Sequence, residues 1–200
     1  QVSEIAAMRI GILHPGEMGI SIAASAKNSG HEVYWTSEGR GPATRERAAK
    51  FELHDARSLA DLCALCPVIL SVCPPHAAES VANQVLETGF DGIYVEANAI
   101  APQRTIGIGE RMSRAGVSFV DGGIIGFPAW KAGSTFLYLS GRRAADIEPC
   151  FSAGPLETRV LGADIGKASA LKMCYAAYTK GTTALLSAII ATAESLDVRD

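Results

Sequence analysis

The stretch that decides the fold is Ile10-Gly11-Ile12-Leu13-His14-Pro15-Gly16-Glu17-Met18-Gly19. Its apolar start predicts a strand over residues 8–13, and the pattern after the turn predicts a helix over 17–29. Gly16 and Gly19 match the second and third glycines of a G-x-G-x-x-G motif, while His14 stands at the first. Such a turn lets a pyrophosphate approach the helix N–H groups. We therefore predict that the turn binds a dinucleotide through Pro15, Gly16, Glu17 and Met18, with an ordinary strand-to-helix turn as the alternative.

Outward from this stretch, short β-branched runs alternate with helical segments for about 160 residues. This alternation is typical of a parallel sheet flanked by helices. We expect an α/β, doubly wound Rossmann-type domain over residues 8–163. Its further strands are predicted at 32–36, 68–73, 93–96, 118–121, 135–139 and 158–161, and its further helices at 44–51, 58–65, 77–86, 102–115 and 145–151.

The pattern changes near residue 165, where a single long helix is predicted over 168–196. Its apolar residues do not fit one stripe, so it needs cover from several sides, from more chain or from a partner. We expect residues 164–200 to be a long interdomain helix that begins an all-α C-terminal domain, truncated or absent here, and to support a homodimer. Residues 1–7 resemble a dispensable leader or cloning remnant.

Composition excludes several classes of protein. Of 200 residues, 48% are hydrophobic and 20% charged, which excludes wholesale disorder. The net charge of −3 predicts no nucleic-acid partner and no anionic membrane surface. Five cysteines, an odd number, favour reduced thiols in a soluble, cytoplasmic protein. The Cys63-Ala-Leu-Cys66 motif has no second ligand pair, so we expect core packing and no metal site.

The end of the second predicted strand bears on the choice of cofactor. A small polar residue with a nearby arginine suits the 2′-phosphate of NADP, whereas an acidic residue suits the ribose hydroxyl of NAD. Ser37 occupies the strand end, and Arg40 and Arg45 follow within a few residues. We predict NADP, with NAD possible because Glu38 could take the acidic role.

Other candidate residues follow the remaining strands, where open α/β sheets place their ligands. Cys73-Pro74-Pro75 and Asn98 lie after two predicted strands, and a glycine-rich loop over residues 121–126 follows a third. Each could also be a plain turn.

Lys172 lies in an otherwise apolar part of the long predicted helix. Burial would lower its pKa and suit it to proton transfer near neutral pH. Tyr175, Ala176 and Thr179 fall on the same face by helical spacing. The alternative is a side chain that reaches solvent.

In order along residues 8–200, these motifs resemble the β-hydroxyacid dehydrogenase and 6-phosphogluconate dehydrogenase superfamily, and most closely its phosphogluconate-dehydrogenase-like branch. The matching motifs are Gly16-x-Met18-Gly19, Gly30-His31-Glu32-Val33, Phe119-Val120-Asp121-Gly122-Gly123, and Gly162-x-x-x-Gly166 ahead of Lys172-Met173.

The resemblance implies roles for individual residues. Lys172 would be the catalytic acid/base. Cofactor contacts would fall on the glycine turn, on Ser37, Glu38 and Arg40, on Cys73, Pro74 and Pro75, and on Asn98. Substrate contacts would fall on Gly122, Gly123, Ile124, Tyr175 and Thr179.

Two departures from the family pattern affect the substrate prediction. The family's serine falls on Ile125, and its paired asparagines fall on Tyr175 and Ala176. The implied function is an NADP-dependent oxidoreductase that moves hydride to or from a hydroxylated carbon of a small hydroxy-acid or sugar-acid-like substrate. An imine-reductase-like enzyme and a non-catalytic dinucleotide-binding module are the alternatives.

Overall fold

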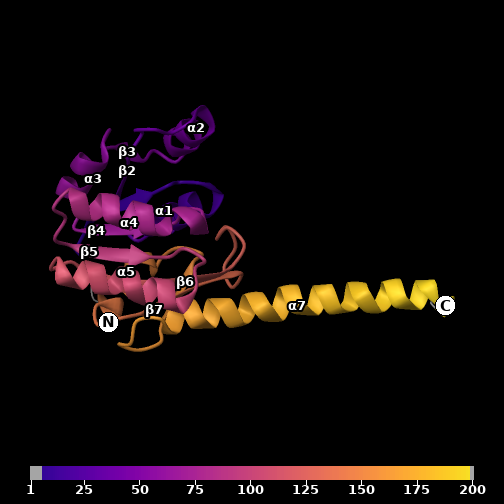
Figure 1. The fold of residues 1–200 in the computed structure, drawn as a ribbon. Helices are drawn as coiled ribbons and strands as arrows, with labels where there is room; N and C mark the ends of the chain where they lie inside the picture. The colour runs from indigo at the N-terminus through magenta and orange to yellow at the C-terminus, as the bar shows by residue number, and fades with distance from the viewer. Residues whose placement is uncertain (1–5, 199–200) are drawn as a thin grey trace.

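The computed structural model describes residues 6–198, so most of the predicted leader lies outside the described residues. Eight strands form one sheet in the order β3-β2-β1-β4-β5-β6-β7-β8 (Figure 1). Their bounds are β1 Arg9–Leu13, β2 Glu32–Trp35, β3 His54–Asp55, β4 Val68–Ser71, β5 Ile93–Glu96, β6 Ser118–Gly126, β7 Thr135–Ser140 and β8 Glu157–Val160. All neighbouring strands pair in parallel except β6 and β7. The prediction of a doubly wound α/β fold is confirmed.

The chain order places the carboxyl ends of β1, β2, β4, β5 and β6 at one edge of the sheet. From β1 the chain first builds outward through β2 and β3, and then returns to add β4 on the other side of β1. Between β1 and β4 the direction of strand addition therefore reverses. Open α/β sheets bind their ligands at such a point, because the loops diverge there and leave a crevice.

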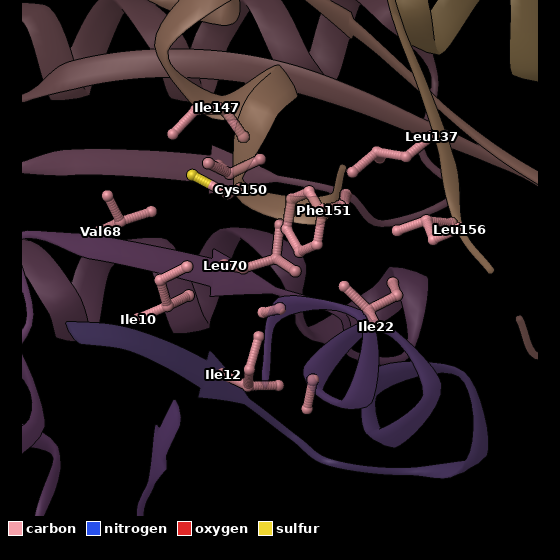
Figure 2. Close-up of a cluster of buried hydrophobic side chains, with 14 of the residues drawn as sticks. Ile10, Ile12, Ile22, Val68, Leu70, Leu137, Ile147, Cys150, Phe151 and Leu156 are labelled. Carbon is pink, nitrogen blue, oxygen red and sulfur yellow. The ribbon is translucent and has the colours of Figure 1, made fainter. Parts of the chain in front are cut away.

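Helices cover both faces of the sheet (Figure 1). Side chains of α1 (Glu17–Asn28), α2 (Pro42–Lys50), α6 (Ala144–Ile147) and the 3₁₀ helix η2 (Glu148–Phe151) join one buried cluster with even-numbered residues of β1 and β4. Figure 2 shows this core, in which Phe151 lies near Leu70. A second cluster on the other face includes side chains of α3 (Leu59–Leu65), α4 (Ala78–Glu87) and α5 (Pro102–Arg114).

The structure corrects four local predictions. The stretch 121–126 is not a loop, because β6 continues through it and pairs antiparallel with β7. The two-residue strand β3 was not predicted, because so short a strand carries no alternating pattern. The predicted helix over 145–151 is divided into α6 and η2, since Pro149 lacks the N–H that would continue the α-helix. Helix α4 begins after a 3₁₀ turn, η1 (Pro75–Ala77).

The long helix is confirmed as α7 (Lys167–Ser195), 29 residues in length. Its first turns pack beside α5 and on β6, and the rest extends away from the sheet (Figure 1). Among the helices described, none combines the length and hydropathy needed to cross a membrane.

Candidate functional site

The glycine turn between β1 and α1 has the geometry of an anion cradle. The Gly16 N–H donates to the His14 carbonyl at 2.7 Å, and Gly16 is the residue that precedes α1. A Cβ on Gly19 would lie 2.6 Å from the His14 carbonyl oxygen, so only glycine fits there. At Gly16 the nearest such atom is 3.9 Å away, which leaves the backbone open to a ligand. No side chain caps α1, and its first N–H groups are available to a pyrophosphate.

Two predicted residues of this turn also contact α2. The Pro15 carbonyl accepts a hydrogen bond from Arg47 at 3.4 Å, and the Glu17 carboxylate lies 4.0 Å from the same guanidinium. Arg47 thus ties α2 to the turn. Glu17 is mostly exposed and lines a hollow between α1, α2 and Trp130, away from the other predicted cofactor contacts.

On the β2 side of the turn, a hollow of about 260 Å³ is lined by His14, Thr36, Glu38 and Arg40, among others. Glu38 accepts a hydrogen bond from the Leu59 N–H at 3.3 Å, at the start of α3. The Nε of Arg40 is buried and has no hydrogen-bond partner.

Ser37 and Arg45 shape the loop around this hollow. Arg45 donates to the carbonyl oxygens of Ser37 at 2.7 Å and of Arg40 at 3.0 Å. The Ser37 N–H donates to the Asp55 carboxylate at 3.1 Å. Arg45 therefore holds the loop, and Arg40 is the guanidinium positioned to meet a ligand.

On the other side of the turn, a hollow of about 180 Å³ brings together residues from five parts of the chain. Pro74 lies between Cys73 and Pro75 along the chain and is the residue that precedes η1. The lining includes six predicted site residues, namely Met18, Cys73, Pro75, Asn98, Ile124 and Lys172.

Asn98 is held by three hydrogen bonds beneath this hollow. Its Oδ1 accepts from the Cys73 N–H, its Nδ2 donates to Ser71 Oγ at 3.1 Å, and its own N–H donates to Glu96 Oε1 at 3.1 Å. It is only 4% exposed. Asn98 therefore fixes the turn after β4 to the turn after β5, which sets the shape of the wall that a cofactor would meet.

Two buried carboxylates lie side by side next to Asn98. Glu96 and Asp121 occupy paired positions of β5 and β6, and both are fully buried. Asp121 accepts from Ser140 Oγ (2.9 Å), from Ser169 Oγ (2.5 Å) and from the N–H groups of Gly166 and Ser169 (2.9 and 3.1 Å). The two hydrogen bonds from the backbone N–H groups of Gly166 and Ser169 cap the N-terminus of α7.

Glu96 is less well satisfied than Asp121. Its Oε2 is buried without a hydrogen-bond partner of normal geometry. Burial raises the pKa of Glu96 to about 7. Near neutral pH this side chain holds its proton for part of the time.

Lys172 is positioned by the capped first turn of α7. It lies one turn after Ser169, and its Cβ is 3.3 Å from the point that a Cβ on Gly123 would occupy. Burial, and secondarily the charge of Lys180, lowers the pKa of Lys172 from its usual value of 10.5. A partly desolvated amine at the edge of a hollow can accept and return a proton.

The predicted substrate residues are less concentrated. A Cβ on Gly123 would lie 2.5 Å from the Ala168 carbonyl oxygen, and one on Gly122 would lie 3.1 Å from Ala97 Cβ. Both glycines thus have a packing reason for their presence. The hydroxyl of Thr179 donates to the Tyr175 carbonyl at 3.0 Å and to that of Ala176 at 3.3 Å, within α7.

Tyr175 is not brought into the hollow that Lys172 lines. It lines another hollow, of about 550 Å³, with Phe136, Tyr138, Leu171 and Tyr178 between α7 and β7. Residues three apart on a helix are rotated by about 60°, and this rotation separates the hollow that Tyr175 lines from the one that Lys172 lines. On α7 that rotation is enough to turn Tyr175 toward β7.

Sequence reasoning did not assign roles to Glu96, Asp121, Ser140 or Ser169. An acidic residue at the end of an apolar strand was the available signal for the two carboxylates. Nothing in the sequence indicates that Ser140 and Ser169, far apart along the chain, would both donate to Asp121.

The Cys-x-x-Cys motif packs in the core, as predicted. Cys63 and Cys66 are buried in the cluster around α3 and α4, and burial raises the pKa of Cys66 to about 12. Among residues 6–198, no three His, Cys, Asp or Glu side chains gather where they could hold a metal ion.

Two comparisons concern relatives in sequence. Residues 9–153 match the family model described as the NAD binding domain of 6-phosphogluconate dehydrogenase. An uncharacterized 28.5 kDa protein in the 7S RNA 5′ region of Methanothermus fervidus is 29% identical over 194 residues, which are 96% of this chain and 74% of that protein.

Solved structures give the same picture. A conserved protein of unknown function, described as structurally similar to 3-hydroxyacid dehydrogenases, is 32% identical with a TM-score of 0.80, over 96% of this chain and 72% of that one. The 3-hydroxyisobutyrate dehydrogenase of Mycobacterium tuberculosis, solved with L-serine, is 17% identical with a TM-score of 0.79. An imine reductase of Myxococcus stipitatus, solved with NAD⁺, is 19% identical with a TM-score of 0.77. Each of these two matches covers 96% of this chain and 67% of the other, and at such identities the likeness shows the fold alone.

Proposed function

Because the chain belongs to the family defined by the NAD-binding domain of 6-phosphogluconate dehydrogenase, whose scaffold is that of an NAD(P)-dependent dehydrogenase or reductase, we propose that it oxidises or reduces a hydroxylated carbon with NADP. The substrate would be a small hydroxy-acid or sugar-acid-like molecule. The cofactor fits the chain's own residues, since the open backbone at Gly16 and the two flanking hollows offer room for a pyrophosphate and the groups on either side of it. When bound, the nicotinamide supplies or accepts the hydride.

The observation that carries this proposal is the position of Lys172. Its side chain lines the same hollow as Met18, Cys73 and Asn98, and burial lowers its pKa. In the direction of oxidation the neutral amine accepts the hydroxyl proton, and in the direction of reduction the ammonium returns it. The capped α7 and the hydrogen-bonded Asn98 hold the two sides of the hollow, which limits the positions open to a substrate.

The first prediction tests this role. Lys172→Ala should lower turnover by about 10²-fold or more, in the range of general acid–base effects, while the affinity for NADP stays within a few-fold. Turnover is followed through nicotinamide absorbance, and affinity through titration calorimetry. The matched control is Lys167→Ala, which removes another lysine of α7 that pairs with Asp164 at the surface.

Three results would contradict the proposal. Equal turnover in Lys172→Ala and in the unchanged protein would exclude the lysine as acid/base. If hydroxy acids and sugar acids are inert while cyclic imines turn over, the protein is an imine reductase on the same scaffold. If nothing turns over but the dinucleotide binds, it is a non-catalytic binding module.

The second prediction concerns cofactor choice. Arg40, with a buried and unpartnered Nε, supports NADP, since a guanidinium pairs well with a phosphate. The Glu38 carboxylate already accepts a hydrogen bond from the Leu59 N–H at the start of α3, so it is less available to bind a ribose hydroxyl. We expect NADP to bind about tenfold more tightly than NAD, by one charge-assisted interaction. Parallel calorimetric titrations measure the ratio, and tighter binding of NAD would overturn the assignment.

We also propose a homodimer in which α7 packs against its counterpart or against a helical domain of the partner. Beyond its first turns, α7 exposes Leu185, Leu186, Ile189 and Ile190 to solvent among the described residues. The exposed apolar side chains support the assembly.

A further inference from the structure

The hollow beside β2 is lined by His14, a titratable side chain to which the proposed function assigns no role. The residue stands where the G-x-G-x-x-G motif has its first glycine, and its φ of +68° lies in the left-handed region. A side chain in that region is strained relative to glycine. The backbone bond from Gly16 uses only the His14 carbonyl, which glycine would supply equally well. The imidazole is therefore not needed to form the turn.

His14 and Arg40 line the same hollow, and each has a polar atom left over. His14 Nδ1 and Arg40 Nε are both buried without a hydrogen-bond partner of normal geometry. Buried donors and acceptors in folded proteins are nearly always paired, so two unpaired ones in side chains that line the same hollow suggest a missing ligand.

In the protein without a ligand, the charges near the His14 imidazole do not cancel. Arg40 and Glu38 are the charged side chains that line the hollow, and Glu38 is bonded to Leu59 at the start of α3. The Cys73 thiol on the turn after β4 is the other titratable group that interacts with Arg40. Burial, and secondarily the charge of Arg40, lowers the pKa of His14 to about 4. The imidazole is thus neutral near pH 7. Among the described residues, no carboxylate forms a salt bridge with the neighbouring Arg40 guanidinium.

We propose that His14 and Arg40 together form a binding site for a phosphate monoester, the group that NADP carries on its adenosine ribose and NAD lacks. The inference rests on the proposed function for the dinucleotide itself, and it adds His14 as a specificity-determining residue. A phosphate dianion between the two side chains offsets the desolvation and the repulsion from Arg40 that together keep the imidazole neutral. His14 therefore takes up a proton as the anion binds.

The sign of the proton exchange distinguishes this site from an arginine acting alone. A phosphate monoester has a second pKa of about 6, so a site that only selects its dianion releases protons near that pH. A histidine that becomes charged on binding takes protons up instead. The two cases have opposite signs in the same measurement.

The experiment uses adenosine 2′,5′-bisphosphate and adenosine 5′-monophosphate, which differ in the phosphate of interest and carry no nicotinamide. The titrations are done by calorimetry at about pH 6.5, close to the usual pKa of histidine. Repeating them in two buffers of different ionisation enthalpy gives the number of protons exchanged on binding. The unchanged protein should take up protons with the bisphosphate and not with the monophosphate. It should also bind the bisphosphate about tenfold more tightly, the effect of one charge-assisted hydrogen bond.

Two variants complete the test. His14→Gly restores the residue that the backbone prefers, so it should fold, and its unfolding free energy should be equal or higher. It should lose most of the preference for the bisphosphate and all of the proton uptake. His14→Asn tolerates a positive φ and keeps a hydrogen-bonding group but cannot titrate, so it should keep part of the preference without uptake.

The failures are distinguishable. If His14→Gly keeps both the preference and the uptake, the inference about His14 is wrong while an NADP preference through Arg40 stands. If it loses affinity equally for both nucleotides, His14 contacts the adenosine and not the phosphate. If the unchanged protein has no preference for the bisphosphate and binds NAD more tightly than NADP, the proposed cofactor is wrong as well.

Discussion

At the scale of single residues, two adjacent carboxylates differ in what surrounds them, that of Glu96 at the end of β5 and that of Asp121 within β6. Asp121 accepts four hydrogen bonds and lies at the N-terminus of α7. Glu96 has one such bond and a buried, unpartnered oxygen. Burial, and to a lesser degree the neighbouring Asp121, raises the pKa of Glu96 to about 7.

This difference predicts how stability depends on pH. The pKa of Glu96 is about 7 in the folded protein against 4.5 as its usual value, so the folded state binds more protons between these limits. The stability from this group is complete below about pH 4.5 and is lost as pH rises through 7. Glu96→Gln, a neutral side chain of the same shape, should gain about 2 to 3 kcal/mol relative to the unchanged protein between pH 5 and pH 8.

Urea unfolding of both proteins across that range measures the effect, because contributions from other titrating groups cancel in the difference. The control is Glu110→Gln, which alters an exposed carboxylate on α5 that pairs with Arg114. A stability difference between Glu96→Gln and the unchanged protein that does not vary with pH would refute the prediction.

At the scale of the element, α7 is placed on the sheet by a glycine and a capping carboxylate. Gly123 of β6 allows the backbone of α7 to come so close that a Cβ would lie 2.5 Å from the Ala168 carbonyl oxygen. Asp121, two residues earlier on the same strand, accepts hydrogen bonds from the helix's first N–H groups. Together these contacts fix the direction of α7 and the position of Lys172.

Gly123→Ala should therefore destabilise the protein by about 1 to 3 kcal/mol, because the added methyl group meets backbone that cannot move freely. The same variant should lower turnover by displacing Lys172. Gly181→Ala is the matched control, since nothing lies within 4 Å of a Cβ there and alanine favours the helix by up to about 1 kcal/mol. Thermal unfolding and turnover of both variants give the comparison, and equal stability of the two would show that the close approach is not needed.

At the scale of the whole molecule, the long helix leaves apolar surface uncovered. Leu185, Leu186, Ile189 and Ile190 are between 48% and 62% exposed on the part of α7 that extends away from the sheet (Figure 1). Burying the half of each side chain that is still exposed contributes about 1 kcal/mol, roughly half the value for a fully exposed one. Four such side chains from each of two subunits together contribute about 6 to 12 kcal/mol, which is comparable with an association cost of about 4 kcal/mol or more.

The 200-residue chain should accordingly form a dimer at micromolar concentration, as measured by light scattering. Leu186→Glu places a charge among the exposed apolar residues and should shift the protein toward monomer. Ser187→Glu adds the same charge on another side of α7, by helical spacing, and should leave the dimer intact. A monomer in the unchanged protein, or equal effects of the two variants, would disprove assembly through these residues.

Most of the fold follows from local patterns in the sequence. Three features depend on residues that are close together along the chain: the apolar strands, the glycine turn before α1, and the long helix without proline. The spacing of apolar residues and the positions of glycine and proline therefore predict them. The family could be inferred for the same reason, because its motifs are short and ordered.

The site was predicted less completely because it depends on residues that only folding brings together. Met18, Cys73, Asn98 and Lys172 were identified from the sequence as strand-end, turn and helix residues, yet their convergence on one hollow is a property of the sheet order. The sequence by itself determined most of the elements and their order along the chain. Only the tertiary structure decided that the pKa of Glu96 is raised, that Tyr175 turns toward β7, and that His14 and Arg40 line one hollow, because burial and contact between distant segments set those energies.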